Sequence, residues 1–290
     1  LVFDWVYEHP LLIVAAALLL PLPPLLPWAD WLKMPAQWQR ITALAFAIAA
    51  ILIGYWLGWN WSADFTQPVM IALGALVLIG FLSIGWRVAF VVTLMALMFS
   101  VGGRDTLSIS FSGDRTRSYF GVYTIRDHPD AGTRTLSHGT TLHGTQLTRP
   151  GGNRIVTSYY GPDSGVGLAF ERASTLYGPN ASIGVVGLGT GTLACYRQPG
   201  QHWRFFEIDP AIVRIARDGG RFRFFPECAA GVPISLGDAR IELGDAKVVP
   251  PGSFDLLAID AFSSDAIPVH LMTQEAFDVY QNAVRQDGLV

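Results

Sequence analysis

The residue types best suited to bind or transform a small molecule stand at the ends of apolar runs in the second half of the chain. The first group is a glycine-rich stretch, Gly187, Gly189, Thr190 and Gly191, which follows a β-branched run. About sixteen residues later, Glu207 ends a second apolar run. Glycines in such a turn let backbone N–H groups approach a ligand closely, and a carboxylate at the next strand end can bind ribose hydroxyls. The two segments predict an adenosyl site.

A third apolar run, at 232–236, is followed by Asp238 and Ala239. A carboxylate at this position can accept a hydrogen bond from an adenine amino group. Taken alone, Asp238 is equally a turn residue or a helix cap. Because three separate strand ends are expected to meet at one sheet edge, we interpret Asp238 and Ala239 as part of the same adenosyl site.

Two further acids follow the fourth apolar run, at 254–259. Asp260 ends this run, and Asp265 lies in the loop beyond it. Ligands of open α/β sheets bind at the carboxyl ends of the strands, so both acids are expected to face the cleft. Paired carboxylates can hold a cationic amine and accept its proton. The alternative for Asp265 is a solvated acid of the loop.

Histidine and tyrosine pairs precede these motifs. His138 and His143 each come before a glycine, and no carboxylate or cysteine beside them completes a metal site, so we expect them to line a pocket or to be structural. Tyr159 and Tyr160 are either core aromatics or a wall over a bound substrate. No metal site is predicted.

These residues require a mostly parallel sheet to position them. From about residue 170, predicted strands and helices alternate, which is typical of an α/β, Rossmann-like fold. Short strands and turns over 104–160 predict a small β-rich domain ahead of it. The expected strands are 182–187, 203–208, 232–236, 254–259 and a strand from 288; the expected helices are 164–177, 190–197, 210–217 and 273–285.

Residues 1–103 have a different composition, with only seven charged side chains and eight of the nine tryptophans of the chain. Long apolar runs with Trp near their ends are typical of a membrane segment, although the buried helical core of a soluble protein is the alternative. Loop cations on the two sides balance, so charge does not orient the spans. We expect about four transmembrane helices, at 11–27, 41–58, 68–85 and 87–101.

The net charge, the cysteine content and the two ends of the chain narrow its possible partners, disulfides and domains. The net charge of −3 offers no basic patch for nucleic acid. Two cysteines are too few for a disulfide framework, and Cys195 is expected to be a buried, inert thiol. Because the chain starts without Met and ends at Val290, where a strand is opening, we expect a fragment. The predicted domains are 1–103, 104–160 and an incomplete adenosyl-binding domain at 161–290.

Over about 115–290 the chain resembles the spermidine synthase family of polyamine aminopropyltransferases, and in particular its membrane-fused branch. The resemblance implies a small β domain, a Rossmann-like domain, and aminopropyl transfer from decarboxylated S-adenosylmethionine to putrescine without a metal. It also implies site roles, namely ribose binding by Glu207, adenine binding by Asp238, amine activation by Asp260 with Asp265 as its loop companion, and a place near the cofactor for Gln146.

The chain departs from that family in two motifs. Thr190 stands where the soluble enzymes have an aspartate that reads the aminopropyl ammonium, and Tyr159-Tyr160-Gly161-Pro162 replaces their Tyr-His-Glu/Gln-Glu element. Two alternatives therefore stay open, a methyltransferase that uses S-adenosylmethionine and a non-catalytic subunit of a membrane complex. The expected partners are a lipid bilayer, a small-molecule amine, and a homo-oligomer or membrane-protein complex. We expect a multi-pass inner-membrane protein with a cytoplasmic C-terminal domain.

Overall fold

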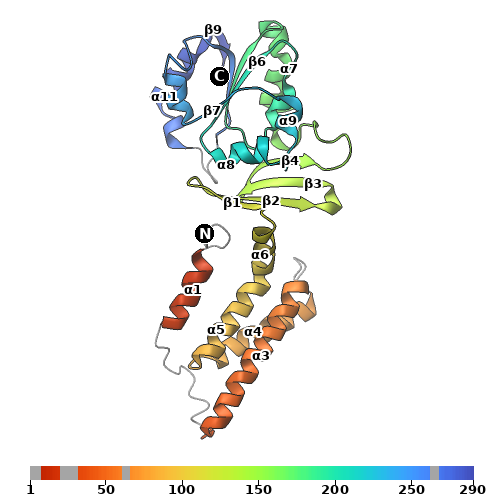
Figure 1. Ribbon diagram of the computed structural model, residues 1–290, viewed down its shortest axis with the longest axis vertical. Coiled ribbons are helices and arrows are strands. Elements are labelled where there is room, and N and C mark those ends of the chain that lie inside the picture. The colour runs from red at the N-terminus through yellow and green to blue at the C-terminus, as the bar shows by residue number, and fades with distance from the viewer. Residues whose placement is uncertain (1–7, 20–31, 61–65, 262–267) are drawn as a thin grey trace. The chain divides into compact units, whose positions relative to one another are not determined.

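The computed structural model describes residues 8–19, 32–60, 66–261 and 268–290. The chain divides between Gly113 and Asp114 into two units, Leu1–Gly113 and Asp114–Val290. The described part of the first unit is helical, and the second contains both sheets (Figure 1).

The described part of the first unit consists mainly of apolar helices. Its helices are α1 (Glu8–Leu19), α3 (Ala36–Asn60), α4 (Gln67–Leu82), α5 (Arg87–Met98), the π-helix η2 (Phe99–Gly103) and α6 (Arg104–Phe111). Within this unit α3, α4 and α5 pack together around Ala50, Leu57 and Leu76, which are fully buried. A Cβ at Gly54 of α3 would lie 2.7 Å from Ala96 Cβ of α5, so this glycine lets the two helices approach closely.

Two of the described helical stretches are long and apolar enough to cross a membrane by length and composition, namely α3 and Arg87–Phe111, and the second is interrupted by a kink with non-helical backbone at Val101 and Gly102. The predicted spans 41–58 and 87–101 fall inside them. Helix α4, which covers most of the predicted span 68–85, has 16 residues and is shorter than the usual requirement. The predicted span 11–27 overlaps α1 and then extends into residues outside the described part. Among the described residues, two helical stretches therefore meet the length and composition of a membrane span, and the arrangement of four spans stays a prediction.

The small sheet has four antiparallel strands in the order β1-β2-β3-β4. The strands are β1 (Arg115–Arg117), β2 (Val122–His128), β3 (Thr133–His138) and β4 (Thr141–Leu147). A two-residue turn through Gly139, which has φ +60°, joins β3 to β4. One face of this sheet contributes Tyr123, Ile125 and Leu136 to the same core as the large sheet, so the two sheets form one packed body.

The large sheet is parallel, with strand order β7-β6-β5-β8-β9. Its strands are β5 (Ser182–Val186), β6 (His202–Glu207), β7 (Ile234–Leu236), β8 (Phe254–Ile259) and β9 (Val284–Leu289). The chain continues from β5 to β6 and β7 on one side and then crosses to β8 and β9 on the other side of β5, as in Rossmann-like doubly wound sheets. The prediction of a mostly parallel α/β sheet is confirmed. The inner strands are almost continuously apolar because helices cover both of their faces.

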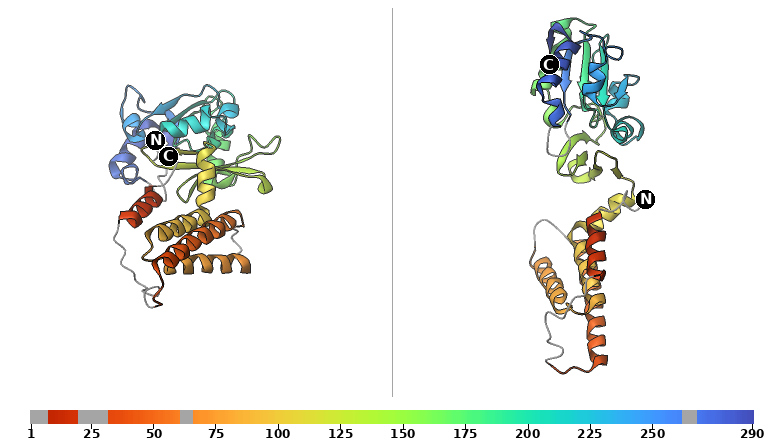
Figure 2. Two further views of the ribbon diagram at one scale, coloured as in Figure 1. Left: turned by 60° about the horizontal axis from the view of Figure 1, so that its bottom comes forward. Right: turned by 90° about the vertical axis from the view of Figure 1, so that its left-hand side faces the viewer.

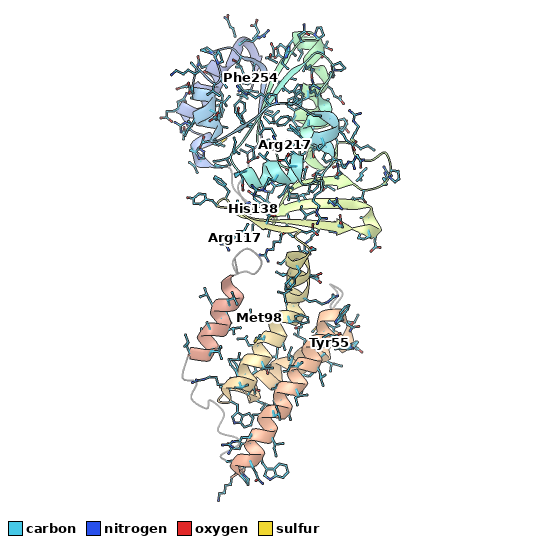
Figure 3. The ribbon with its side chains drawn as sticks, viewed as in Figure 1. Tyr55, Met98, Arg117, His138, Arg217 and Phe254 are labelled. Atoms are coloured by element: carbon cyan, nitrogen blue, oxygen red, sulfur yellow. A yellow bond between two sulfur atoms is a disulfide. The ribbon has the colours of Figure 1, made fainter. Side chains whose placement is uncertain are left out.

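Helices pack on the two faces of this sheet (Figures 1 and 2). One face carries α7 (Gly165–Tyr177), α8 (Pro210–Val213) and α9 (Phe224–Cys228), whose core includes Phe170 and Phe225. The other face carries α10 (Ala239–Gly244) and α11 (Gln274–Ala283), with Phe254 between them and the sheet (Figure 3). N-caps start several of these helices; for example, Ser164 Oγ accepts from Gly167 N at 3.0 Å.

The structure differs from the predicted elements in or next to three of the predicted helices. The segment expected to be a helix at 190–197 is a short 3-10 helix, η5 (Thr192–Tyr196). The helix expected at 210–217 becomes a π-helix, η6 (Arg214–Asp218), after its first turn. Strand β9 begins at Val284 rather than near 288, since α11 ends earlier than expected.

The interpretation of Cys195 as a free buried thiol was wrong. Cys195 in η5 and Cys228 at the end of α9 form a disulfide, with a Cα–Cα distance of 4.8 Å. Their separation of 33 residues hides this proximity in the sequence. The bond ties the segment that follows the glycine-rich turn to α9.

Candidate functional site

A cavity of about 740 Å³ lies at the carboxyl ends of β5, β6 and β8, next to β3 and β4 of the small sheet. This is the edge at which doubly wound sheets bind ligands. Its described walls come from the glycine-rich turn, the residues after β6, β7 and β8, the Tyr159-Tyr160 pair and the 3-10 helix η7 (Val269–Leu271).

The glycine-rich turn lines this cavity through Gly187 and Gly189. Gly187 has φ +95°, and a side chain there would collide with the carbonyl oxygen of Asp260. Gly189 has φ +52°, and a Cβ there would lie 2.8 Å from the carbonyl oxygen of His143. Glycine is therefore required at both positions, by conformation and by close backbone approach, and the cavity floor here is bare backbone.

Glu207 holds this turn in place from the end of β6. Its Oε2 accepts from Leu188 N at 3.0 Å and its Oε1 accepts from Asp209 N at 2.9 Å. Burial raises the pKa of the Glu207 carboxyl to about 7, against the opposing effect of these backbone N–H groups. Glu207 also lines the cavity, so a carboxylate lone pair that the backbone does not use can accept a hydrogen bond from a ligand hydroxyl.

Asp238 fits both interpretations made from the sequence, a helix cap and a residue of the ligand site. Its Oδ1 caps α10, accepting from Arg240 N at 2.9 Å, while its Oδ2 lies 3.1 Å from His270 Nε2. Asp238 and Ala239 both line the cavity. The carboxylate is thus a helix cap that also faces the ligand space. His270, in η7, was not identified from the sequence, because nothing in its neighbours marks it as part of a site.

Asp260 and Tyr160 form a buried hydrogen-bonded pair on another wall of the cavity. Tyr160 Oη donates to Asp260 Oδ2 at 2.5 Å, and Tyr159 Oη lies 3.0 Å from Tyr160 Oη. Burial raises the pKa of Asp260 to about 6, while the Tyr160 hydrogen bond acts in the opposite direction. The pKa of Tyr160 is raised by burial and by the Asp260 charge, so its phenol stays protonated. Asp260 is therefore a carboxylate poised to exchange a proton near neutral pH.

Three predicted cofactor residues do not line the cavity. Thr190 is buried against Gly144, and its Oγ1 pairs with Thr192 Oγ1 at 2.8 Å. Gly191 packs on α9, where a Cβ would lie 2.9 Å from Phe225 Cβ.

Gln146 is also directed into the protein. Its Nε2 donates to Asn153 O at 3.1 Å and its Oε1 accepts from Arg223 N at 3.1 Å, so both ends of the amide are used within the fold. Predicted as cofactor-binding, it supports the structure around the site instead. Asp265, the predicted loop companion of Asp260, lies outside the described residues.

Rings from the small sheet complete the cavity. His138 and His143 line it, as expected for a pocket-lining role, together with Tyr123. The two imidazoles stack with centroids 5.9 Å apart at 23°, and the ring of Tyr123 lies 5.1 Å from that of His138. Tyr123 was not identified from the sequence, where its alternation with polar neighbours indicated only a strand.

Comparison with known proteins supports the resemblance. No family model matches the chain. A curated relative, the polyamine aminopropyltransferase of Vibrio vulnificus, is 31% identical over 138 residues, which covers 44% of this chain and 44% of the relative. The resemblance to polyamine aminopropyltransferases is thereby confirmed, and the chain spans less than half the length of this relative.

Two solved structures are similar in outline. The spermidine synthase of Thermotoga maritima aligns over 60% of this chain and 54% of its own, with a TM-score of 0.40 and 15% identity. A spermidine synthase in complex with the transition state analogue AdoDATO aligns over 60% and 53%, with a TM-score of 0.41 and 14% identity. The likeness to both structures is distant.

Proposed function

We propose that this chain is a membrane-anchored, spermidine synthase-like transferase that moves an aminopropyl group from decarboxylated S-adenosylmethionine to putrescine or another amine. The observation that carries the proposal is the buried Asp260–Tyr160 pair, which shares one cavity with the carboxylate of Glu207 and the glycine-rich turn. A proton acceptor and an adenosyl-binding edge are the two parts that the reaction needs.

In the proposed reaction, Asp260 takes a proton from the acceptor ammonium and leaves a neutral amine. The nitrogen lone pair attacks the aminopropyl carbon next to the sulfonium, a C–N bond forms and the C–S bond breaks. Sulfur keeps the bonding electron pair, so methylthioadenosine leaves as a neutral thioether. The positive charge passes to the new secondary ammonium. The sulfonium is already an activated leaving group, so positioning and deprotonation are sufficient.

The adenosyl group fits the residues that line the cavity. The glycine-rich turn has no side chains at Gly187 and Gly189 to block a nucleoside, and Glu207 offers acceptor lone pairs to the ribose hydroxyls. Asp238 and Ala239 then border the adenine. Oδ2 of Asp238 either leaves His270 to accept from the adenine amino group or accepts from both groups.

Methyl transfer from S-adenosylmethionine is the second candidate. It is favoured by Thr190, an uncharged residue whose hydroxyl is paired with Thr192 away from the cavity. The glycine-rich turn therefore supplies no carboxylate that would repel the methionine carboxylate of the ordinary donor.

The two candidates differ in their nucleoside product. Detergent-solubilised full-length protein is incubated with either donor and a mixed amine pool, and the product is identified by mass spectrometry. Amine-dependent methylthioadenosine is the expected result. S-adenosylhomocysteine would move the protein to the methyltransferases, and adenosyl binding with neither product would favour a non-catalytic subunit.

We further propose that α3 and Arg87–Phe111 anchor the protein in the inner membrane, with α1 and α4 completing a multispan segment. Side chains on α3 such as Leu44, Ile51 and Leu52 are more than half exposed, which suits contact with lipid. The adenosyl-binding unit is placed on the cytoplasmic side, because its donor is made there. Since disulfides are rare in that compartment, the Cys195–Cys228 pair is expected to be reduced in cells and to close on oxidation.

A further inference from the structure

The strand β4 contains a β-bulge at the edge of the cavity. Gly144 pairs with Leu136 and Leu142 pairs with Ser137, so His143 is one extra residue with no counterpart in β3. Bulges re-aim side chains and are frequent beside active sites. Here the bulge brings the His143 carbonyl against Gly189, and the His143 side chain becomes part of the cavity wall.

The His143 imidazole is polar but unsatisfied. Its Nε2 atom is buried and makes no hydrogen bond, and the ring is stacked on His138. Burial and the neighbouring His138 lower the pKa of His143 to about 4, so the ring is uncharged near neutral pH. A buried polar atom without a partner is unfavourable, because it loses its hydrogen bond to water. Because rotation about χ2 of histidine is soft, a bound molecule can turn this nitrogen toward itself and recover that cost.

The acids that line the described part of the cavity leave one carboxylate for an amine. Among the described residues that line it, the acids are Glu207, Asp238 and Asp260. The first binds the glycine-rich turn at the ribose position and the second caps α10 and contacts His270. Asp260 is then the described acid available to an amine. Within the described walls, a second ammonium on the acceptor would lie beside aromatic rings with no further carboxylate to pair with, so its charge would be less well compensated there than in water.

We propose that His143 is a specificity-determining residue, whose ring nitrogen hydrogen-bonds to an uncharged polar group, such as a hydroxyl, on the far end of the acceptor amine. This inference rests on the proposed function and names its acceptor class, a monoamine with an uncharged polar substituent rather than a diamine. The attacking amine is held by Asp260, and the far end lies against His143 and Leu142 in the same cavity.

The test compares two acceptors of matched length, 4-aminobutan-1-ol and 1,4-diaminobutane. Each is titrated by calorimetry into the detergent-solubilised full chain saturated with methylthioadenosine. We expect the amino alcohol to bind about tenfold more tightly, the effect of one satisfied buried hydrogen bond. His143→Phe should abolish the preference, and His143→Asp should reverse it by supplying a second carboxylate.

Controls separate specificity from folding. His128→Gln alters an exposed histidine on β2, paired with Thr135 and not among the residues lining the cavity, and should keep the preference. Unchanged methylthioadenosine affinity in each variant confirms an intact fold. A wild-type preference for the diamine would overturn the proposal, whether or not Asp265→Asn removes that preference. An unchanged preference in His143→Phe would also overturn it.

Turnover measurements distinguish the proposed role of His143 from the proposed aminopropyl transfer. Preference for the amino alcohol in binding, without methylthioadenosine release from either acceptor, would leave the role of His143 standing and reject aminopropyl transfer. Amine-dependent turnover that favours the diamine in both wild type and His143→Phe would support the reaction and reject the acceptor class.

Discussion

Glu207 is the residue on which the proposed adenosyl recognition should depend most, because its Oε2 holds the glycine-rich turn and its side chain lines the cavity. In Glu207→Gln the amide nitrogen cannot accept from a backbone N–H, so the turn loosens and one ribose contact is lost. We expect adenosyl affinity to fall about 10–100-fold, the range for one or two hydrogen bonds to a charged group. Calorimetry with methylthioadenosine measures this. Unchanged affinity would contradict the ribose assignment.

The pH dependence of the reaction should report Asp260. Its carboxyl, with a pKa of about 6, accepts a proton only when ionised, so kcat/KM for the amine should fall as pH drops through about 6. In Tyr160→Phe the hydrogen bond that stabilises the carboxylate is absent, and the midpoint should move to higher pH. Profiles are measured at saturating donor, so that Glu207 protonation does not enter.

Tyr159→Phe is the matched control for this profile, since Tyr159 contacts Tyr160 rather than Asp260. It should shift the midpoint less than Tyr160→Phe. Equal midpoints in wild type and Tyr160→Phe would show that another group limits the rate.

At the scale of elements, the disulfide links η5, directly after the glycine-rich turn, to α9. Closing a loop of this size stabilises a fold by about 3 kcal/mol. Reductant should therefore lower the thermal unfolding midpoint of the oxidised full chain and weaken methylthioadenosine binding. Cys195→Ser should match the reduced protein and be insensitive to reductant. A midpoint that reductant leaves unchanged would mean that α9 holds η5 by packing alone.

Strand ends were the most predictable part of this site. Apolar runs that terminate at Gly187, Glu207 and Asp260 locate the sheet edge by periodicity alone, and all three residues line the cavity. The β-bulge that places His143 beside that edge was not predictable. The bulge at His143 depends on how β4 pairs with β3, and pairing register is set by long-range contacts that no local pattern records.

Side-chain direction explains why two of the predicted cofactor residues do not line the cavity. Thr190 and Gln146 have polar types suited to a ligand, yet Thr190 pairs with Thr192 while Gln146 bridges Asn153 to Arg223. Buried polar groups find partners wherever the fold offers them. Because the residue type does not reveal which partner the fold supplies, a polar residue next to a motif can support the site from inside the protein instead of lining it.

At the scale of the whole molecule, the helical unit should hold the protein in a membrane. After alkaline carbonate extraction, the full chain is expected in the membrane pellet. Ile51→Arg, which places a charge on an exposed apolar position of α3, should shift protein toward the supernatant because a buried charge in lipid is costly. Ile241→Arg, at an exposed position of α10, should not. Release of the wild-type chain by carbonate would contradict anchoring.

In the proposed function, Asp260 activates an amine for transfer from an adenosyl donor bound at the neighbouring strand ends. The most direct test of this role is amine-dependent methylthioadenosine release by full-length wild type and Asp260→Asn, with donor affinity measured on the same samples. We expect release by wild type, loss of turnover in Asp260→Asn, and donor affinity within about tenfold of wild type, because the proton acceptor is lost while the Glu207 contacts remain. Turnover that survives in Asp260→Asn, or equal loss of turnover and donor binding, would contradict it.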